Sequence, residues 1–198
     1  MNKFFAAIGV SIALMAPATA ADIKFIGSDI ISVSGRIEPG DHLTISPIVL
    51  RNMPDSTTII LNSGGGFGNA AYLIGRAIRN RGLATKIPAG ARCDSACSFL
   101  WLAGVRREIN CQARIGLHAP RKSGTFEPSE PGNKIMADYM AEMGAPKEMI
   151  DLALQTDLAA VTYVDHAQLR QWGLVNSPAC PQSRPRNSDR RSGSPAPR

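Results

Sequence analysis

Apolar residues follow a strand-like pattern in the first part of the chain and a helical pattern further on. Residues 30–37 alternate between apolar and polar side chains over part of their length, which predicts a β-strand. Residues 57–61 form a short β-branched apolar run that is typical of a buried strand. Between residues 68 and 81 the apolar positions recur every three or four residues, so we expect an amphipathic helix that Gly82 ends.

The same order of strand and helix returns in the later part of the chain. We expect a strand at 83–87, a helix from 94 to 102, a strand at 113–117, an exposed loop at 121–132, helices at 133–143 and 146–155, and a helical turn at 166–172. Strands that alternate with helices predict an α/β fold with mostly parallel strand pairing.

The two ends of the chain differ from the segment between them. Residues 1–20 combine Lys3, an apolar run and an Ala-x-Ala ending, a pattern typical of a secretory signal peptide, although a buried N-terminal helix is the alternative. We expect cleavage after Ala20 and a mature domain at 21–180 that is periplasmic or secreted. Residues 181–198 are rich in Pro, Ser and Arg and cannot build a core, so we expect a disordered basic tail. No apolar run is long enough for a transmembrane segment.

The formal net charge of +6 is concentrated in the tail rather than in the domain. Residues 181–198 hold five arginines against one aspartate, and Lys3 adds one positive charge, which leaves +1 for residues 21–180. A nearly neutral domain lacks the basic patch that nucleic-acid binding requires. We therefore expect no nucleic acid among its partners.

The four cysteines are Cys93, Cys97, Cys111 and Cys180. An even number of cysteines in an exported chain predicts two disulfides, with three possible connectivities. The rival interpretation is a zinc site, because Cys93-x3-Cys97 has roughly the spacing of metal ligands. Export favours disulfides, and we expect no metal. Spacing does not fix the connectivity, but if Cys93 pairs with Cys97, then Cys111 is left to pair with Cys180.

A glycine-rich turn, Asn62-Ser63-Gly64-Gly65-Gly66, follows the strand expected at 57–61 and precedes the helix expected at 68–81. Glycines allow backbone N–H groups to approach a ligand closely and to point into a site. No Lys-Ser/Thr pair follows the turn, which argues against a nucleoside triphosphate loop. A tight turn without any ligand is the alternative.

Ser95 and His118 are the strongest candidates for a nucleophile and its base. Ser95 lies where a helix is expected to begin, so it is either an ordinary N-cap or a nucleophile whose oxyanion the Ala96 N–H would stabilise. His118 follows a predicted strand, where an imidazole can act as a base or simply have a structural role. His42, in a Gly-Asp turn, and His166, at a polar helix start, are weaker candidates.

Taken together, these motifs resemble the proteolytic subunit of the Clp protease in both content and order over residues 57–176. The matching segments are Leu61-Asn62-Ser63-Gly64-Gly65-Gly66, Ser95 opening a helix that ends Leu102-Ala103-Gly104, Arg106-Arg107, Ile115-Gly116-Leu117-His118-Ala119-Pro120, and Ala167 to Val175. The Cys93-x-Ser95-x-Cys97 variant with a signal peptide is similar to exported bacterial relatives. The resemblance implies a ClpP/crotonase-like spiral of repeated strand-strand-helix units.

The resemblance also assigns roles within the expected site. It implies that Ser95 is the nucleophile, that His118 is the base, and that Gly65, Gly66 and Ala96 form the oxyanion hole. It further implies a homo-oligomer that acts on a peptide or protein substrate.

The expected acid is missing from its usual place. The alignment puts Val161 at the position of the family's aspartate, with Asp157 and Asp165 four residues away on either side. Either Asp157 or Asp165 takes the place of the acid, or the site is a Ser-His dyad. Loss of the orienting acid costs a triad orders of magnitude in rate.

The sequence therefore predicts a periplasmic serine hydrolase, a peptidase that uses neither ATP nor a cofactor. Export separates it from the cytosolic unfoldase of Clp proteases, so small or unfolded polypeptides are the expected substrates. The alternative is a catalytically inactive ClpP-like binding or assembly protein of the periplasm. Other hydrolytic or acyl-thioester chemistry is a third possibility.

Overall fold

The computed structural model describes residues 20–122, 124–125, 127–176 and 180. The expected tail and all but the last residue of the expected signal peptide lie outside the described residues. Within the described ranges, no helix is long and apolar enough to cross a membrane.

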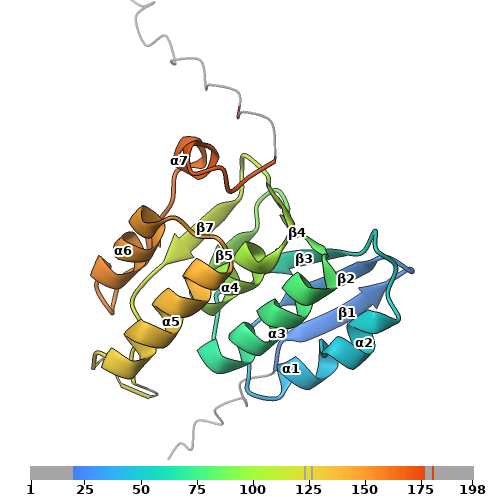
Figure 1. The fold of residues 1–198 in the computed structure, drawn as a ribbon, viewed down its shortest axis with the longest axis horizontal. Coiled ribbons are helices and arrows are strands. Elements are labelled where there is room, and N and C mark those ends of the chain that lie inside the picture. The colour runs from blue at the N-terminus through green and yellow to red at the C-terminus, as the bar shows by residue number, and fades with distance from the viewer. Residues whose placement is uncertain (1–19, 123, 126, 177–179, 181–198) are drawn as a thin grey trace, which may run out of the picture.

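The described strands form two sheets (Figure 1). They are β1 (Asp22–Ile26), β2 (Ile30–Ser34), β3 (Thr58–Asn62), β4 (Ala84–Ile87), β5 (Arg92–Asp94), β6 (Arg106–Ile109), β7 (Arg114–Leu117) and β8 (Thr162–Tyr163). The first sheet has the order β1-β2-β3-β4-β6, and the second has the order β5-β7-β8. All pairs are parallel except β1 with β2 and β7 with β8, which are antiparallel.

The helices connect and cover these strands. They are α1 (Asp41–Thr44), α2 (Pro47–Arg51), α3 (Gly68–Arg81), α4 (Ala96–Ala103), α5 (Glu130–Glu142), α6 (Lys147–Gln155) and α7 (His166–Gln171). Figure 1 shows α1, α2 and α3 in front of the first sheet, with α5 and α6 to one side of them.

The first sheet and α3 form because their apolar positions meet. In β3, Ile59 and Leu61 are fully buried, as expected for a strand with a parallel neighbour on each side. Ile74 and Ile78 of α3 are fully buried as well. Gly82 ends α3 in the left-handed conformation, with a φ of +72°. The predicted helix over 68–81 is confirmed.

The chain order produces a repeating strand-strand-helix unit. β4, β5 and α4 form one unit, and β6, β7 and α5 form the next, so that each unit gives one strand to each sheet. The stretch from β3 to α3 follows the same order, but its second strand is reduced to one residue. That residue is Ser63, which makes an isolated bridge to Cys93 beside the second sheet. The predicted α/β spiral is confirmed, and it brings the turns after β3 and β5 next to each other.

Several short elements were not predicted, and two boundaries differ by three residues. Strand β2 ends at Ser34 rather than at residue 37, and Ile37 makes an isolated bridge to Gly66 instead. β1, α1, α2, β5, β6 and β8 have no more than five residues each, too few for a periodic pattern. Helix α5 begins at Glu130, inside the expected loop, rather than at residue 133. The reason is local: the Ser129 hydroxyl accepts a hydrogen bond from the Gly132 N–H at 3.2 Å, and a proline lies in the first turn.

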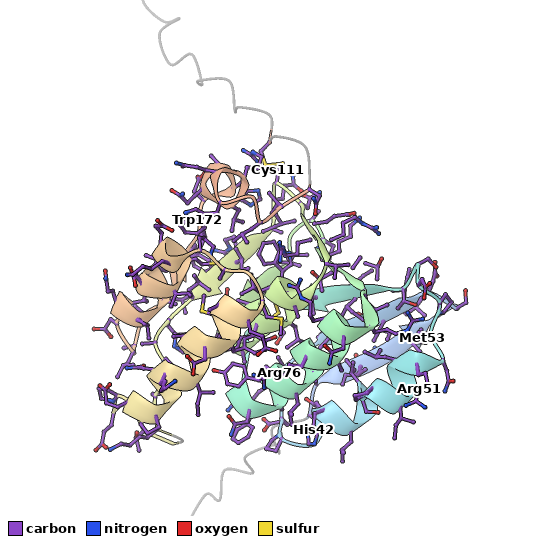
Figure 2. All side chains as sticks on the ribbon, in the orientation of Figure 1. His42, Arg51, Met53, Arg76, Cys111 and Trp172 are labelled. Carbon is purple, nitrogen blue, oxygen red and sulfur yellow. A yellow bond between two sulfur atoms is a disulfide. The ribbon has the colours of Figure 1, made fainter. Side chains whose placement is uncertain are left out.

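Helix α5 is held against α3 and α4 by Tyr139. Its hydroxyl donates to the Phe99 carbonyl at 2.9 Å and lies over Gly75, where a β-carbon would overlap it. Arg76, on α3 (Figure 2), forms a two-pronged ion pair with Glu142 at the end of α5. These contacts fix α5 as one wall of the groove described below.

Both expected disulfides are present. Cys93 pairs with Cys97 across the β5–α4 turn, and Cys111 pairs with Cys180. Figure 2 shows Cys111 beside α7, where the described chain ends. Because these sulfurs are bonded to each other, Cys93 and Cys97 do not provide the thiolates that the alternative zinc site would need.

Candidate active site

Ser95 occupies a strained turn between β5 and α4. Its φ of +55° is the only positive value among the described non-glycine residues. The Ser95 N–H donates to the Gly116 carbonyl at 2.9 Å, and its own carbonyl accepts from the N–H and the hydroxyl of Ser98. Strain that neighbouring bonds maintain in this way is concentrated at functional sites, and a nucleophile on a sharp strand-to-helix turn is a known example.

The glycine turn after β3 packs directly on this serine. A β-carbon on Gly65 would stand 2.7 Å from the Ser95 Cβ and 2.9 Å from the Ala96 nitrogen. A β-carbon on Gly66 would overlap the Ile37 carbonyl oxygen, and both glycines have positive φ. Glycine is therefore required at both positions by close approach and by backbone conformation.

The N–H groups of Gly66 and Ala96, in the two turns that meet at Ser95, donate to no described residue. The Gly65 N–H donates to the Ser63 hydroxyl at 3.0 Å, so it is already engaged. The bridge to Ile37 uses the Gly65 carbonyl and the N–H that follows Gly66, which leaves the Gly66 N–H out of it. The Ala96 N–H belongs to the first turn of α4, where no intrahelical carbonyl can accept it.

His118 follows β7 and is half-buried. Its Nδ1 lies 2.7 Å from the Ala119 carbonyl oxygen. A carbonyl only accepts, so Nδ1 carries the hydrogen and Nε2 keeps its lone pair for a base. Within the described part of the chain, no hydrogen bond joins the imidazole to Ser95. Catalytic hydrogen bonds are often long until substrate is bound, so the separation does not remove the pair from consideration.

Ser95 and His118 line one groove of about 880 Å³, which we call the serine groove. Its walls come from the start of α3, from α4, from α5 and from the residues after β7. Tyr72, Phe99 and Ile135 supply apolar surface. The groove is large enough for several residues of an extended peptide.

The serine groove also contains basic side chains. Arg36, Arg92, Arg121 and Lys122 line it. Arg36 and Lys122 have carboxylate partners of their own at 2.8 Å.

Neither Asp157 nor Asp165 is among the residues that line the serine groove. Asp165 is the N-cap of α7 and accepts from the Ala167 N–H at 2.6 Å. Asp157 is exposed, accepts from a backbone N–H two residues later, and lines a pocket of about 440 Å³ that adjoins the serine groove through Pro120, Leu158 and Ala159. Among the described residues, neither carboxylate forms a hydrogen bond with His118.

Val161 does line the serine groove. The antiparallel register pairs Leu117 with Thr162, so the next residues outward on the two segments are His118 and Val161. The valine therefore occupies the place opposite the histidine where the resemblance puts the acid.

Asp94 is the site residue that the sequence interpretation missed. It directly precedes Ser95, lines the serine groove and is only 4% exposed. Its Oδ1 has no hydrogen-bond partner, and its Oδ2 lies 3.8 Å from Nη1 of Arg92. Burial raises the pKa of the Asp94 carboxyl, while Arg92, Arg114, the Tyr163 hydroxyl and His118 oppose the rise. A charged residue among the small residues of the Ser95 turn was the signal available in the sequence.

The other two histidines lie outside the serine groove. Nδ1 of His42 is 2.6 Å from the Pro39 carbonyl oxygen on the surface. His166 lies with Nδ1 3.1 Å from the Cys180 sulfur. The donor atoms of Cys111, His166 and Cys180 lie within 4.8 Å of one another, but the two sulfurs are joined in a disulfide.

The two sheets and the repeated strand-strand-helix units form a ClpP-like α/β fold. The solved structures with a similar fold include three of mutant proteins. One is a mutant of ClpP1 from Listeria monocytogenes, 21% identical, with a TM-score of 0.58 over 75% of this chain and 90% of that one. The other two are mutants of the 1510-N membrane-bound stomatin-specific protease.

The two stomatin-specific protease structures match slightly less of their own chains. One, in complex with a substrate peptide, is 15% identical, with a TM-score of 0.58 over 76% of this chain and 75% of that one. The other is 16% identical, with a TM-score of 0.57 over 73% of this chain and 75% of that one. No protein-family model matches the sequence, and no curated protein matches it. At these identities the likeness establishes the fold.

Proposed function

We propose that this protein is an exported serine hydrolase, a peptidase that acts through Ser95 and His118. The observation that carries the proposal is the strained Ser95 turn, with the Gly66 and Ala96 N–H groups beside it. His118 lies in the same groove, with Nε2 available as a base. Together they supply a nucleophile, a base and oxyanion donors.

In the proposed reaction, Ser95 Oγ attacks the substrate carbonyl carbon while His118 Nε2 accepts the hydroxyl proton. The carbonyl oxygen takes up the electron pair and is stabilised by the Gly66 and Ala96 N–H groups. The imidazolium then donates its proton to the leaving amine, and an acyl-enzyme remains. His118 Nε2 then accepts a proton from water, and the water oxygen attacks the ester carbonyl carbon. The ester C–O bond breaks, the imidazolium returns the proton to Ser95 Oγ, and the acid is released.

The proposed substrates are small or already unfolded polypeptides. The groove has a volume of about 880 Å³ and is partly apolar, which suits an extended chain. One structural neighbour is a protease in complex with a substrate peptide, which supports the same class of ligand. Export, proposed from residues 1–20, would separate the enzyme from ATP-driven unfoldases. The two disulfides are compatible with an oxidising compartment. A homo-oligomer stays a prediction from the resemblance.

A catalytically inactive ClpP-like binding or assembly protein is the second candidate. Two observations favour it: Val161 stands opposite His118, and no hydrogen bond joins Ser95 to His118 among the described residues. Such a protein would bind peptide in the serine groove and release it unchanged.

Hydrolysis of an activated ester and of unstructured peptides tests the proposal. The protein should be prepared oxidised, without residues 1–20. We expect turnover that Ser95→Ala abolishes and that Ser56→Ala, a change at an exposed serine, leaves intact. Peptide binding without turnover in the wild type would favour the inactive candidate instead.

A further inference from the structure

Asp94 carries a buried carboxylate, and folding stability does not explain its position. The other buried aspartate among the described residues, Asp41, accepts hydrogen bonds from the Glu38 N–H at 2.7 Å and the Ala21 N–H at 3.3 Å. Asp94 is buried to a similar degree and lines the serine groove, yet its Oδ1 makes no hydrogen bond to any described residue. A buried carboxylate oxygen without a hydrogen bond costs stability, so a functional reason for it is expected.

The location of Asp94 suggests that reason. A β-carbon built on Gly116 would stand 2.7 Å from Asp94 Oδ1 and even closer to Val161 Cγ1. The Asp94 carboxylate therefore lies beside the valine that faces His118. In the second sheet, β5 and β8 flank β7 on opposite sides, so a carboxylate can reach the end of β7 from either neighbour.

We propose that Asp94 is the positioning acid of this site and supplies from β5 the negative charge that Val161 lacks. The proposal rests on the proposed function. The two roles of a triad aspartate are divided here: the Ala119 carbonyl holds the Nδ1–H of His118, and the Asp94 charge stabilises the imidazolium that forms when Ser95 loses its proton. Asp94 itself takes no proton.

Burial raises the pKa of the Asp94 carboxyl, and the charged and polar groups around it oppose that rise. Arg92 comes from its own strand, Arg114 from β7, Tyr163 from β8, and His118 follows β7. The Arg92 ion pair at 3.8 Å is long, so it does not neutralise the carboxylate as a close pair would. The positive charge that forms on His118 favours the ionised carboxylate, so the two charges stabilise each other.

Asp94→Asn tests the proposal because it removes the charge and keeps the shape. We expect kcat/KM for the activated ester to fall about 10- to 100-fold, less than in a triad whose acid also holds the histidine. The thermal midpoint should not fall, because an unsatisfied buried charge is removed. The matched control is Asp41→Asn, which should leave kcat/KM unchanged and should not raise the midpoint. A merely structural Asp94 would instead lose midpoint and activity together.

Val161→Asp tests the proposal by rescue, and its expected effect differs between the Asp94→Asn protein and the wild type. In the Asp94→Asn protein, an aspartate opposite His118 should recover at least about fivefold in kcat/KM. In the wild type the same substitution puts two carboxylates side by side, so no gain is expected. The neutral change Val161→Asn should rescue neither background.

The outcomes separate the two proposals. A wild-type protein with no Ser95-dependent turnover would overturn the proposed function and the role of Asp94 with it. Active wild type with an equally active Asp94→Asn variant would overturn the role of Asp94 only. A large loss of kcat/KM in Asp157→Asn or Asp165→Asn, with no loss in Asp94→Asn, would also overturn the role of Asp94. The orienting acid would then be the aspartate whose variant loses activity.

Discussion

Gly65 packs so closely on Ser95 that a β-carbon on the glycine would lie 2.7 Å from the serine Cβ. The two residues come from turns that follow strands of different sheets, and a bridge between Ser63 and Cys93 brings those turns together. The glycine turn therefore shapes the backbone around the serine. This contact links a sequence motif that is weak evidence by itself to a second motif 30 residues later.

Gly65→Ala should disturb both stability and activity. The new β-carbon would meet backbone atoms at Asp94 and Ala96, and the φ of +90° is unfavourable for alanine. We expect a loss of about 1–3 kcal/mol in the free energy of unfolding and a larger proportional loss of kcat/KM. Gly40→Ala is the matched control, because its φ is −79° and nothing lies within 4 Å. Equal behaviour of the two variants in urea unfolding would contradict the account.

Much of the fold follows from local patterns. Helix α3 and its glycine stop are readable because 14 residues carry a full amphipathic period. Strand β8, with two residues, has no such pattern, and its place is set by pairing with β7. The start of α5 was misplaced because the Pro- and Gly-rich segment was interpreted as a loop, although Ser129 caps a helix there.

The site was predicted in part for the same reason. Ser95, His118 and the glycine turn each have a local signature at a strand end. The partner of His118 depends on which strands flank β7, and residue spacing does not report that. Asp94 reaches the side chain of Val161 from the opposite side of β7, and no local pattern in the sequence around Val161 indicates this.

The two disulfides should contribute unequally to stability. Cys111 and Cys180 are 69 residues apart, whereas Cys93 and Cys97 are four apart. By the chain-entropy relation, the long loop contributes about 4 kcal/mol and the short one about 2 kcal/mol. Urea unfolding of the two paired Cys→Ala variants measures both contributions. A larger loss from the short pair would mean that native contacts, not chain entropy, dominate.

The stability difference between wild type and Asp94→Asn should depend on pH. Burial raises the pKa of Asp94 above its unfolded value, so folding favours the protonated form. The stabilisation from Asp94 is thus fully present below the unfolded pKa and is lost as pH rises through the raised folded value. In urea unfolding from about pH 3 to about pH 8, the free energy of unfolding of Asp94→Asn should rise relative to that of the wild type. If the wild type instead gained free energy of unfolding relative to the asparagine variant as the pH rises, the cause assigned to the shift would be contradicted.

His118→Ala should abolish turnover to about the same extent as Ser95→Ala. The neutral serine hydroxyl is a weak nucleophile until a base takes its proton, so the double variant should be little worse than either single one. His42→Ala is the matched control, since His42 makes the same kind of contact with a carbonyl outside the groove. Additive losses from Ser95→Ala and His118→Ala would indicate that the two residues do not act as one unit.

Covalent labelling with a fluorophosphonate tests the central claim most directly. The oxidised protein should be labelled near neutral pH, and the modified peptide identified by mass spectrometry. The account predicts one adduct, on Ser95, that forms much more slowly in His118→Ala and not at all in the unfolded protein. An unmodified Ser95 in the folded wild type, or an adduct that persists in Ser95→Ala, would contradict it.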